Sequence, residues 1–195
     1  MFNQCVKTIL LPSLLLLSTQ AAATWQIDND HSRVNFVSVK NNMVAENHHF
    51  KTISGTLSKQ GQFLLDIELG SVETNIPIRN ERMQKFLFNI ADFPTMKVSA
   101  DVQALLQQVK TKGWAQAPVE ATLVLNGKTK VQAIDLIATM DKKNKIVVSS
   151  LTPVLVNPAD YGLSQGIDKL QEIAGLQSIT RAVPVSFVLT LNDSQ

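Results

Sequence analysis

The sequence contains a single cysteine, Cys5, and a single charged residue, Lys7, before Asp28. An apolar run follows (ILLPSLLLLS) and then three alanines, a succession typical of a cleaved secretory signal. The run is about half of the ~20 residues that a membrane-spanning helix requires. We therefore predict a signal peptide at 1–23 and one mature domain at 24–195, which has no cysteine and cannot form a disulfide.

An excess of charge of one sign is also missing. The chain has 18 basic and 16 acidic residues, a formal net charge of +2, and removal of Lys7 with the signal peptide lowers it to +1. The basic residues are scattered rather than gathered in a stripe, so the sequence predicts no nucleic-acid partner. Because no second apolar stretch could span a membrane, we expect not an integral membrane protein but a soluble protein of the bacterial envelope, most simply of the periplasm.

The sequence patterns that usually carry catalysis are absent. No glycine-rich loop could hold a phosphate, and no acid and base are paired on a predicted element. His48 and His49 are neighbours, so on a strand they point to opposite faces and cannot easily share a metal. His31 and Ser32 diverge for the same reason and form no nucleophile pair. The sequence therefore predicts no enzyme, no metal site and no cofactor. It gives His31 a structural role, in which its ring hydrogen-bonds backbone groups where the chain enters its first long strand.

Alternation of apolar and polar residues is abundant. Seven or eight segments alternate with a period of two, the pattern of strands with one buried face. Turn sequences such as Asn126-Gly127 separate them. Long strands joined by short turns predict an all-β, mostly antiparallel fold, either a sandwich or a closed barrel. The faces expected to be buried comprise Val34 and Phe36; Phe63, Leu65, Ile67 and Leu69; Met96, Val98, Ala100 and Val102; Val119, Ala121, Leu123 and Leu125; and Val183, Val185, Phe187, Leu189 and Leu191.

Two segments have helical spacing instead. Residues 79–90 and 168–176 each place apolar side chains on one face of a short helix, and we expect each helix to cover an edge or an open end of the sheet. Arg79, Arg82 and Lys85 are spaced three apart at the start of the first helix. Two interpretations are open: these cations and the helix start bind a phosphate-like anion, or Arg79 pairs with an acidic residue and fixes the helix to the barrel.

The order of several short motifs resembles the YceI family of lipid-binding bacterial proteins. The motifs are a Trp followed by Ile-Asp and His-Ser, a Ser-x-x-Thr strand end, an arginine-containing helix, a Phe-to-Pro approach to a strand, and a turn that ends in glycine. The resemblance covers nearly all of residues 25–191. The family's usual Arg-Asp pair is Arg-Asn in this chain. The matching positions are Trp25, Ile27-Asp28, His31-Ser32, Ser71 to Thr74, Arg79-Asn80, Phe88 to Pro94, and Leu123 to Gly127.

The resemblance implies an extended eight-stranded antiparallel β-barrel, similar to a lipocalin, with one or two short helices at its edges. It also implies a periplasmic or secreted protein that holds an isoprenoid, such as a polyprenyl phosphate or a quinone, in the apolar interior of the barrel. Arg79 and Arg82 are the candidates for contacting a polar head group. The candidate lining residues are Val34, Phe36, Val98, Ala100, Leu123, Leu125, Val185 and Phe187.

Three functions are open on this basis. The first is a non-enzymatic carrier that sequesters an isoprenoid lipid. The second is an envelope stress or interaction protein whose barrel is simply a packed core. The third, which the residues favour least, is an enzyme that acts on a bound lipid. An elongated cavity would favour the carrier and a filled interior the interaction protein, while a homodimer is compatible with either.

Overall fold

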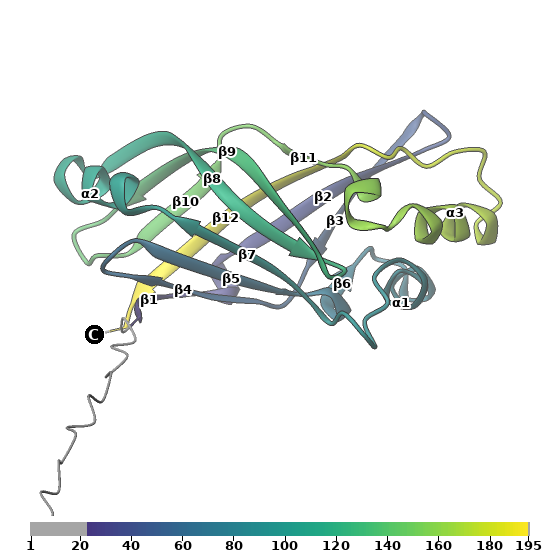
Figure 1. Cartoon of the computed structure of the whole chain (residues 1–195), viewed down its shortest axis with the longest axis horizontal. Coiled ribbons are helices and arrows are strands. Elements are labelled where there is room, and N and C mark those ends of the chain that lie inside the picture. The colour runs from purple at the N-terminus through teal and green to yellow at the C-terminus, as the bar shows by residue number, and fades with distance from the viewer. Residues whose placement is uncertain (1–22, 195) are drawn as a thin grey trace, which may run out of the picture.

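An antiparallel sheet closes into an elongated barrel in the computed structural model, which describes residues 23–194 (Figure 1). Neighbouring strands pair all the way round the ring, and the last strand, β12, pairs with the first, β1. The predicted eight-stranded antiparallel barrel is thereby confirmed. Its ring consists of β1 (Ala23–Ile27), β4 (Ile53–Ser58), β5 (Gln62–Glu68), β7 (Thr95–Asp101), β8 (Trp114–Leu125), β9 (Lys128–Met140), β10 (Ile146–Ser150) and β12 (Val183–Asp193).

Four further strands lengthen the barrel. They are β2 (Arg33–Lys40), which continues β1, β3 (Val44–Phe50), which leads into β4, β6 (Val72–Glu73), which follows β5, and β11 (Val154–Val156), which follows β10. Eight strand paths therefore surround the axis, and the β2–β3 hairpin projects beyond the ring at one end (Figure 1). Short 3-10 helices interrupt or follow the strands at Asn29–His31, Leu69–Ser71 and Pro158–Tyr161.

Strand β8 illustrates how the sequence determines the two faces of a strand. Ala121, Leu123 and Leu125 are buried, whereas Glu120, which points to the other face of the strand, is exposed. A shift of register by one residue would turn the apolar face toward water. The alternation therefore fixes the pairing with β7, where Val98 lies opposite Leu123.

Helix α2 (Gln103–Lys112) covers one end of the barrel (Figure 1). It turns Leu105, Leu106 and Val109 into the interior, where all three are buried. This helix was missed in the sequence. Only Val102 separates it from β7, and that residue continues the period-two alternation of the strand, so no turn sequence announces a change of structure.

The other end is covered by α1 (Pro77–Arg82), which continues as a π-helical turn (Met83–Leu87), and by α3 (Ser164–Ile173) (Figure 1). These are the helices predicted at 79–90 and 168–176, but they begin two and four residues earlier, and each ends three residues earlier. Pro77 suits the first turn because its φ is already helical. At Gly166 a Cβ would lie 2.5 Å from the carbonyl oxygen of Phe86, so the missing side chain lets α3 pack against the π-helical turn.

Candidate functional site

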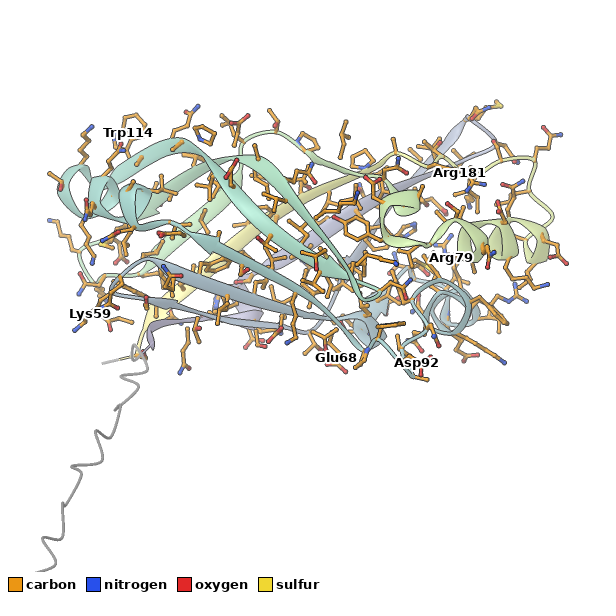
Figure 2. All side chains as sticks on the ribbon, in the orientation of Figure 1. Lys59, Glu68, Arg79, Asp92, Trp114 and Arg181 are labelled. Atoms are coloured by element: carbon orange, nitrogen blue, oxygen red, sulfur yellow. The ribbon has the colours of Figure 1, made fainter. Side chains whose placement is uncertain are left out.

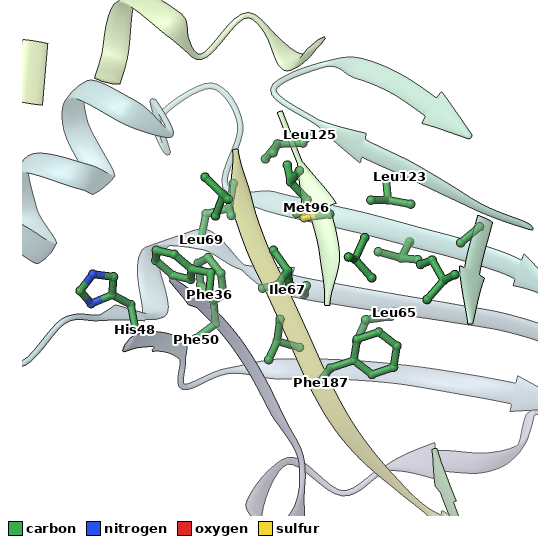
Figure 3. Close-up of a pocket in the computed structure, with 18 of the residues that line it drawn as sticks. Phe36, His48, Phe50, Leu65, Ile67, Leu69, Met96, Leu123, Leu125 and Phe187 are labelled. Atoms are coloured by element: carbon green, nitrogen blue, oxygen red, sulfur yellow. The ribbon is translucent and has the colours of Figure 1, made fainter. Parts of the chain in front are cut away.

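The barrel encloses an apolar cavity of about 520 Å³, a volume typical of sites for small molecules. Leu106 of α2 lines it at one end, and Ile78 of α1 and Leu170 of α3 line it at the other. Side chains from strands around the ring point into it (Figure 3). We call the end beside α1 and α3 the mouth. The polar residues of the cavity wall are Ser38, Lys40, His48, Arg79, Arg82 and Thr180.

The structure places all eight predicted lining residues on the wall of this cavity. Strand pairing brings them together: Phe36 lies opposite Val185, and Val98 lies opposite Leu123. That these residues bind a ligand remains a prediction. The full set on the wall is Val34, Phe36, Val98, Ala100, Leu123, Leu125, Val185 and Phe187.

Several inward-facing side chains are only partly buried. Val98, Ala100, Val185 and Phe187 point into the cavity, yet each keeps some accessible surface. In a core packed to the usual density of protein interiors, neighbouring side chains would cover them. The interior is therefore an open lumen rather than the packed core of the alternative interpretation.

His48 is a residue of the cavity wall that the sequence interpretation did not select. It is 3 % exposed, and its Nε2 lies 2.8 Å from Ser38 Oγ, whereas Nδ1 has no hydrogen-bond partner among the described residues. Burial, followed by the positive charge of Arg79, lowers the pKa of His48 to about 4, so the ring is neutral near pH 7. The period-two alternation with Phe50 was the signal that places it inside.

Arg79, which lies in α1 at the end of the barrel covered by α3 (Figure 2), forms the main polar link at the mouth with Glu46. Arg79 Nη1 donates to Glu46 Oε2 at 2.7 Å, and Nη2 donates to the carbonyl oxygen of Thr74 at 2.6 Å. Lys40 Nζ lies 2.7 Å from the same Glu46 oxygen. The hydrogen bond from Lys40, together with the charge of Arg79, lowers the pKa of the Glu46 carboxyl despite its partial burial. Of the two interpretations of Arg79, the ion pair that fixes α1 to the hairpin is therefore present.

Arg82 and Lys85 are placed differently from Arg79. Arg82 lines the cavity at the mouth, and Lys85 lies on the exposed side with its Nζ 5.2 Å from the centre of the Phe86 ring. Neither has an ion-pair partner among residues 23–194. The three cations therefore do not converge on one point, and Arg82 is the cation of the cavity wall that is left without an acidic partner.

Comparison with known proteins gives the same result as the motifs. Residues 25–191 match the family of the YceI-like domain. The chain belongs to this family. Its structure is similar to that of a polyisoprenoid binding domain from Saccharophagus degradans implicated in plant cell wall breakdown, with 35 % sequence identity and a TM-score of 0.84 over 88 % of this chain and 99 % of that one.

More distant structures share the fold of this YceI-like domain. Burkholderia cenocepacia BcnA is 17 % identical with a TM-score of 0.65, over 84 % of this chain and 98 % of that chain. A YceI protein of Campylobacter jejuni is 14 % identical with a TM-score of 0.55, over 76 % and 85 %. No curated protein matches the chain significantly.

Asn80 stands where the family usually has an aspartate after the arginine. Its Oδ1 accepts from the backbone N–H of Thr74 at 2.9 Å and from Thr74 Oγ1 at 2.6 Å, and its Nδ2 donates to Glu73 Oε1 at 3.0 Å. The amide thus ties the start of α1 to the end of β6. Because the amide also donates, it pairs with the Glu73 carboxylate, which an aspartate at this position would repel.

The structural role predicted for His31 is realised in a different way. Its ring does not bond the backbone: Nδ1 lies 2.9 Å from the Asp28 carboxylate, and the ring is largely exposed. The His31 carbonyl accepts from Thr190 Oγ1 at 2.8 Å, and Ser32 Oγ accepts from the Thr190 N–H at 2.9 Å. The sequence placed the contact on the ring because it could not reveal the neighbouring strand β12.

Two negative findings apply to the described part of the chain. Within it, no three His, Cys, Asp or Glu side chains come close enough to hold a metal ion. The helices of residues 23–194 are all too short or too polar to cross a membrane.

Proposed function

We propose that the protein is a non-enzymatic carrier that holds a polyisoprenoid lipid in the lumen of its barrel. The observation that carries the proposal is the apolar cavity, whose inward side chains are left partly uncovered. The similarity to a domain described as polyisoprenoid-binding, at 35 % identity and over 99 % of that domain, supports the same ligand class.

An isoprenoid chain gains free energy by entering such a lumen. Each CH₂-sized group removed from water contributes about 0.8 kcal/mol, so ten such groups contribute roughly 8 kcal/mol. The ordering of the chain and the loss of translational freedom oppose this gain. The lipid needs polar partners at one end only, and the wall matches this need because its polar residues are confined to the mouth.

The polar residues at the mouth offer partners for a head group. Arg79 Nε and His48 Nδ1 are buried and have no hydrogen-bond partner within the described chain. An unsatisfied buried polar atom is costly, and an oxygen atom of a head group would give Arg79 Nε–H an acceptor. Glu46 already pairs with both Lys40 and Arg79. A charged phosphate would therefore depend mainly on Arg82, whereas a neutral quinone oxygen would need hydrogen bonds alone.

Two arginine variants separate these head groups. Arg79→Ala should lower the melting temperature, because it removes the link from α1 to Glu46 and Thr74. Arg82→Ala breaks no ion pair in residues 23–194 and should leave the fold intact. If the lipid carries a phosphate, Arg82→Ala should weaken binding in a salt-sensitive way. Titration with a prenyl phosphate and with a prenyl quinone at two salt concentrations measures this. Unchanged affinity for both lipids would remove Arg82 from head-group binding.

The lumen itself is tested by filling it. Native mass spectrometry of protein purified from its own cells should detect a bound isoprenoid. Ala100→Phe adds a ring on the cavity wall and should exclude the lipid without burying a charge. Val131→Phe makes the same kind of change on the outer surface, where Val131 is 63 % exposed, and should retain the lipid. Equal lipid retention by both variants would contradict binding in the lumen.

We further propose that the protein acts in the periplasm after removal of its signal peptide. The support is the sequence alone, because residues 1–22 lie outside the described part of the chain. N-terminal sequencing of the periplasmic protein should give Thr24 as the first residue. Membrane-bound protein that retains Met1 would refute this processing.

A further inference from the structure

Three segments surround the mouth and expose apolar side chains there. Met43 and Val44 lie at the tip of the β2–β3 hairpin and are 85 % and 51 % exposed; Ile76 and Ile78 lie at the start of α1 and are 42 % and 51 % exposed. The loop from α3 to β12 adds less exposed apolar residues. We call this set the rim: Met43, Val44, Ile76, Ile78, Leu176 and Ile179.

Hydrogen bonds join the rim segments to one another. Asn41 Oδ1, at the hairpin tip, accepts from the backbone N–H groups of Gln177 and Ser178 at 2.8 and 3.3 Å. The ion pair between Arg79 and Glu46 links α1 to the same hairpin. The rim is also continuous with the lumen, because Ile76, Ile78, Leu176 and Ile179 line the cavity.

The rim segments carry no charge. Residues 41–45, 74–78 and 173–180 contain no Asp, Glu, Lys or Arg in a chain that is 17 % charged. Charged residues resume directly beside each segment: Lys40 and Glu46, Glu73 and Arg79, Glu172 and Arg181. An uncharged border with exposed apolar side chains suits a surface that enters an apolar or interfacial environment, where burial of a charge would be costly.

Cations lie directly behind the rim. Between residues 76 and 90 the chain has Arg79, Arg82 and Lys85 but a single acid, Glu81. Arg82 and Lys85 have no ion-pair partner in the described chain. An apolar edge backed by unpaired cations matches the acyl and phosphate layers of an anionic bilayer.

We propose that the rim docks on the surface of an anionic phospholipid bilayer and brings the mouth against it. The part of this inference that concerns cargo rests on the proposed function. A prenyl chain that passed through water between bilayer and lumen would expose apolar surface at about 0.8 kcal/mol per CH₂, and a docked mouth avoids that exposure. The rim consists of separate tips around an opening rather than one flat face, which suits shallow insertion better than packing against a protein.

The test uses the whole mature protein and vesicles that contain no isoprenoid. In sedimentation assays, phosphatidylethanolamine–phosphatidylglycerol vesicles should carry the protein into the pellet, and phosphatidylcholine vesicles should carry less of it.

The variants test the rim residues. Met43→Ser and Ile78→Ser should each weaken vesicle binding by about tenfold, the factor expected for one buried apolar side chain. Leu64→Ser is the matched control, because Leu64 is 56 % exposed on the barrel wall away from the rim. In Met43→Trp, the emission that the new indole adds to that of Trp25 and Trp114 should be blue-shifted on vesicles and quenched by brominated lipid.

Four outcomes would overturn the proposal: no vesicle binding, equal loss in Leu64→Ser, an unshifted indole, or a rim-dependent dimer found by light scattering without lipid. The last would assign the rim to a second copy of the chain. Retention of the isoprenoid is measured separately from vesicle binding, by native mass spectrometry. Met43→Ser should not change this retention directly, because Met43 does not line the cavity. Failure of docking with the lipid still bound would leave the carrier function standing. Docking without retained lipid would refute the carrier function alone.

Discussion

We expect the barrel to lose stability between pH 7 and pH 5, and replacement of His48 by glutamine should remove much of this loss. Burial and the charge of Arg79 lower the pKa of His48 from 6.5 to about 4 in the folded protein. Between these values the unfolded chain binds a proton that the folded chain does not, so the free energy of unfolding falls as the pH falls. For this pair of pKa values the loss is about 2 kcal/mol from pH 7 to pH 5.

The measurement is urea unfolding of delipidated protein at pH 7, 6 and 5. His48→Gln cannot titrate in this range and keeps a polar group near Ser38. Some pH dependence should remain, because burial also lowers the pKa of His49. The pKa values of the Glu46 and Glu73 carboxyl groups are also lowered, but their effect falls below the range of pH 5 to 7. Each carboxylate stabilises the fold above its ordinary pKa of 4.5, and that contribution is lost only as the pH falls further.

His31→Gln is the control, since it removes a largely exposed histidine whose Nδ1 lies beside the Asp28 carboxylate and leaves the cavity wall unchanged. The part of the pH dependence that is due to His48 should remain in this variant. An equal loss of stability from pH 7 to pH 5 in His48→Gln and in the natural protein would refute the reasoning. It would mean that the cavity wall at His48 is solvated enough for the ring to titrate normally.

Four further substitutions test the barrel. Phe36→Asp should unfold it or abolish lipid retention in mass spectra, because an unpaired buried carboxylate is very costly. Gly55→Ala should lower the melting temperature, since its Cβ would lie 2.3 Å from the Leu64 carbonyl oxygen; Gly70→Ala, with its nearest contact at 3.7 Å, should be nearly neutral. Leu106→Ala should reduce the free energy of unfolding by about 2–5 kcal/mol in urea titrations, because it leaves a cavity beneath α2.

The faces of the strands could be predicted because they depend on local alternation. Each strand must turn its apolar residues to one side, so the positions of Phe36, Val98 and Leu123 follow from period two alone. The same rule placed His48 and His49 on opposite faces. It could not show that His48 would line the mouth, because that depends on where the β2–β3 hairpin meets α1.

Contacts between distant segments could not be predicted from the residues. Glu46 and Arg79 are 33 positions apart, and no local pattern singles out Glu46 among the 16 acidic residues as the partner. The ring of His31 was assigned to the backbone for the same reason. Helix α2 was missed because Val102 continues the alternation of β7. A helical signal was nevertheless present, since Leu105, Leu106 and Val109 recur at the spacing of one helix face and are the buried side of α2.

The open lumen follows from which residues the strands turn inward. In a ring of eight strand paths each path faces the one four places away, so β7, β8 and β9 lie across from β12, β2 and β3. A barrel of this size is just wide enough to be filled by side chains or to hold one small ligand. Larger side chains in place of the alanines on β7 to β9 would fill part of the interior. These strands carry Ala100, Ala121 and Ala138 on the cavity wall, among larger aliphatic side chains such as Leu123. The alanines leave room for a ligand, because an interior packed to the usual density would need larger groups at the same positions.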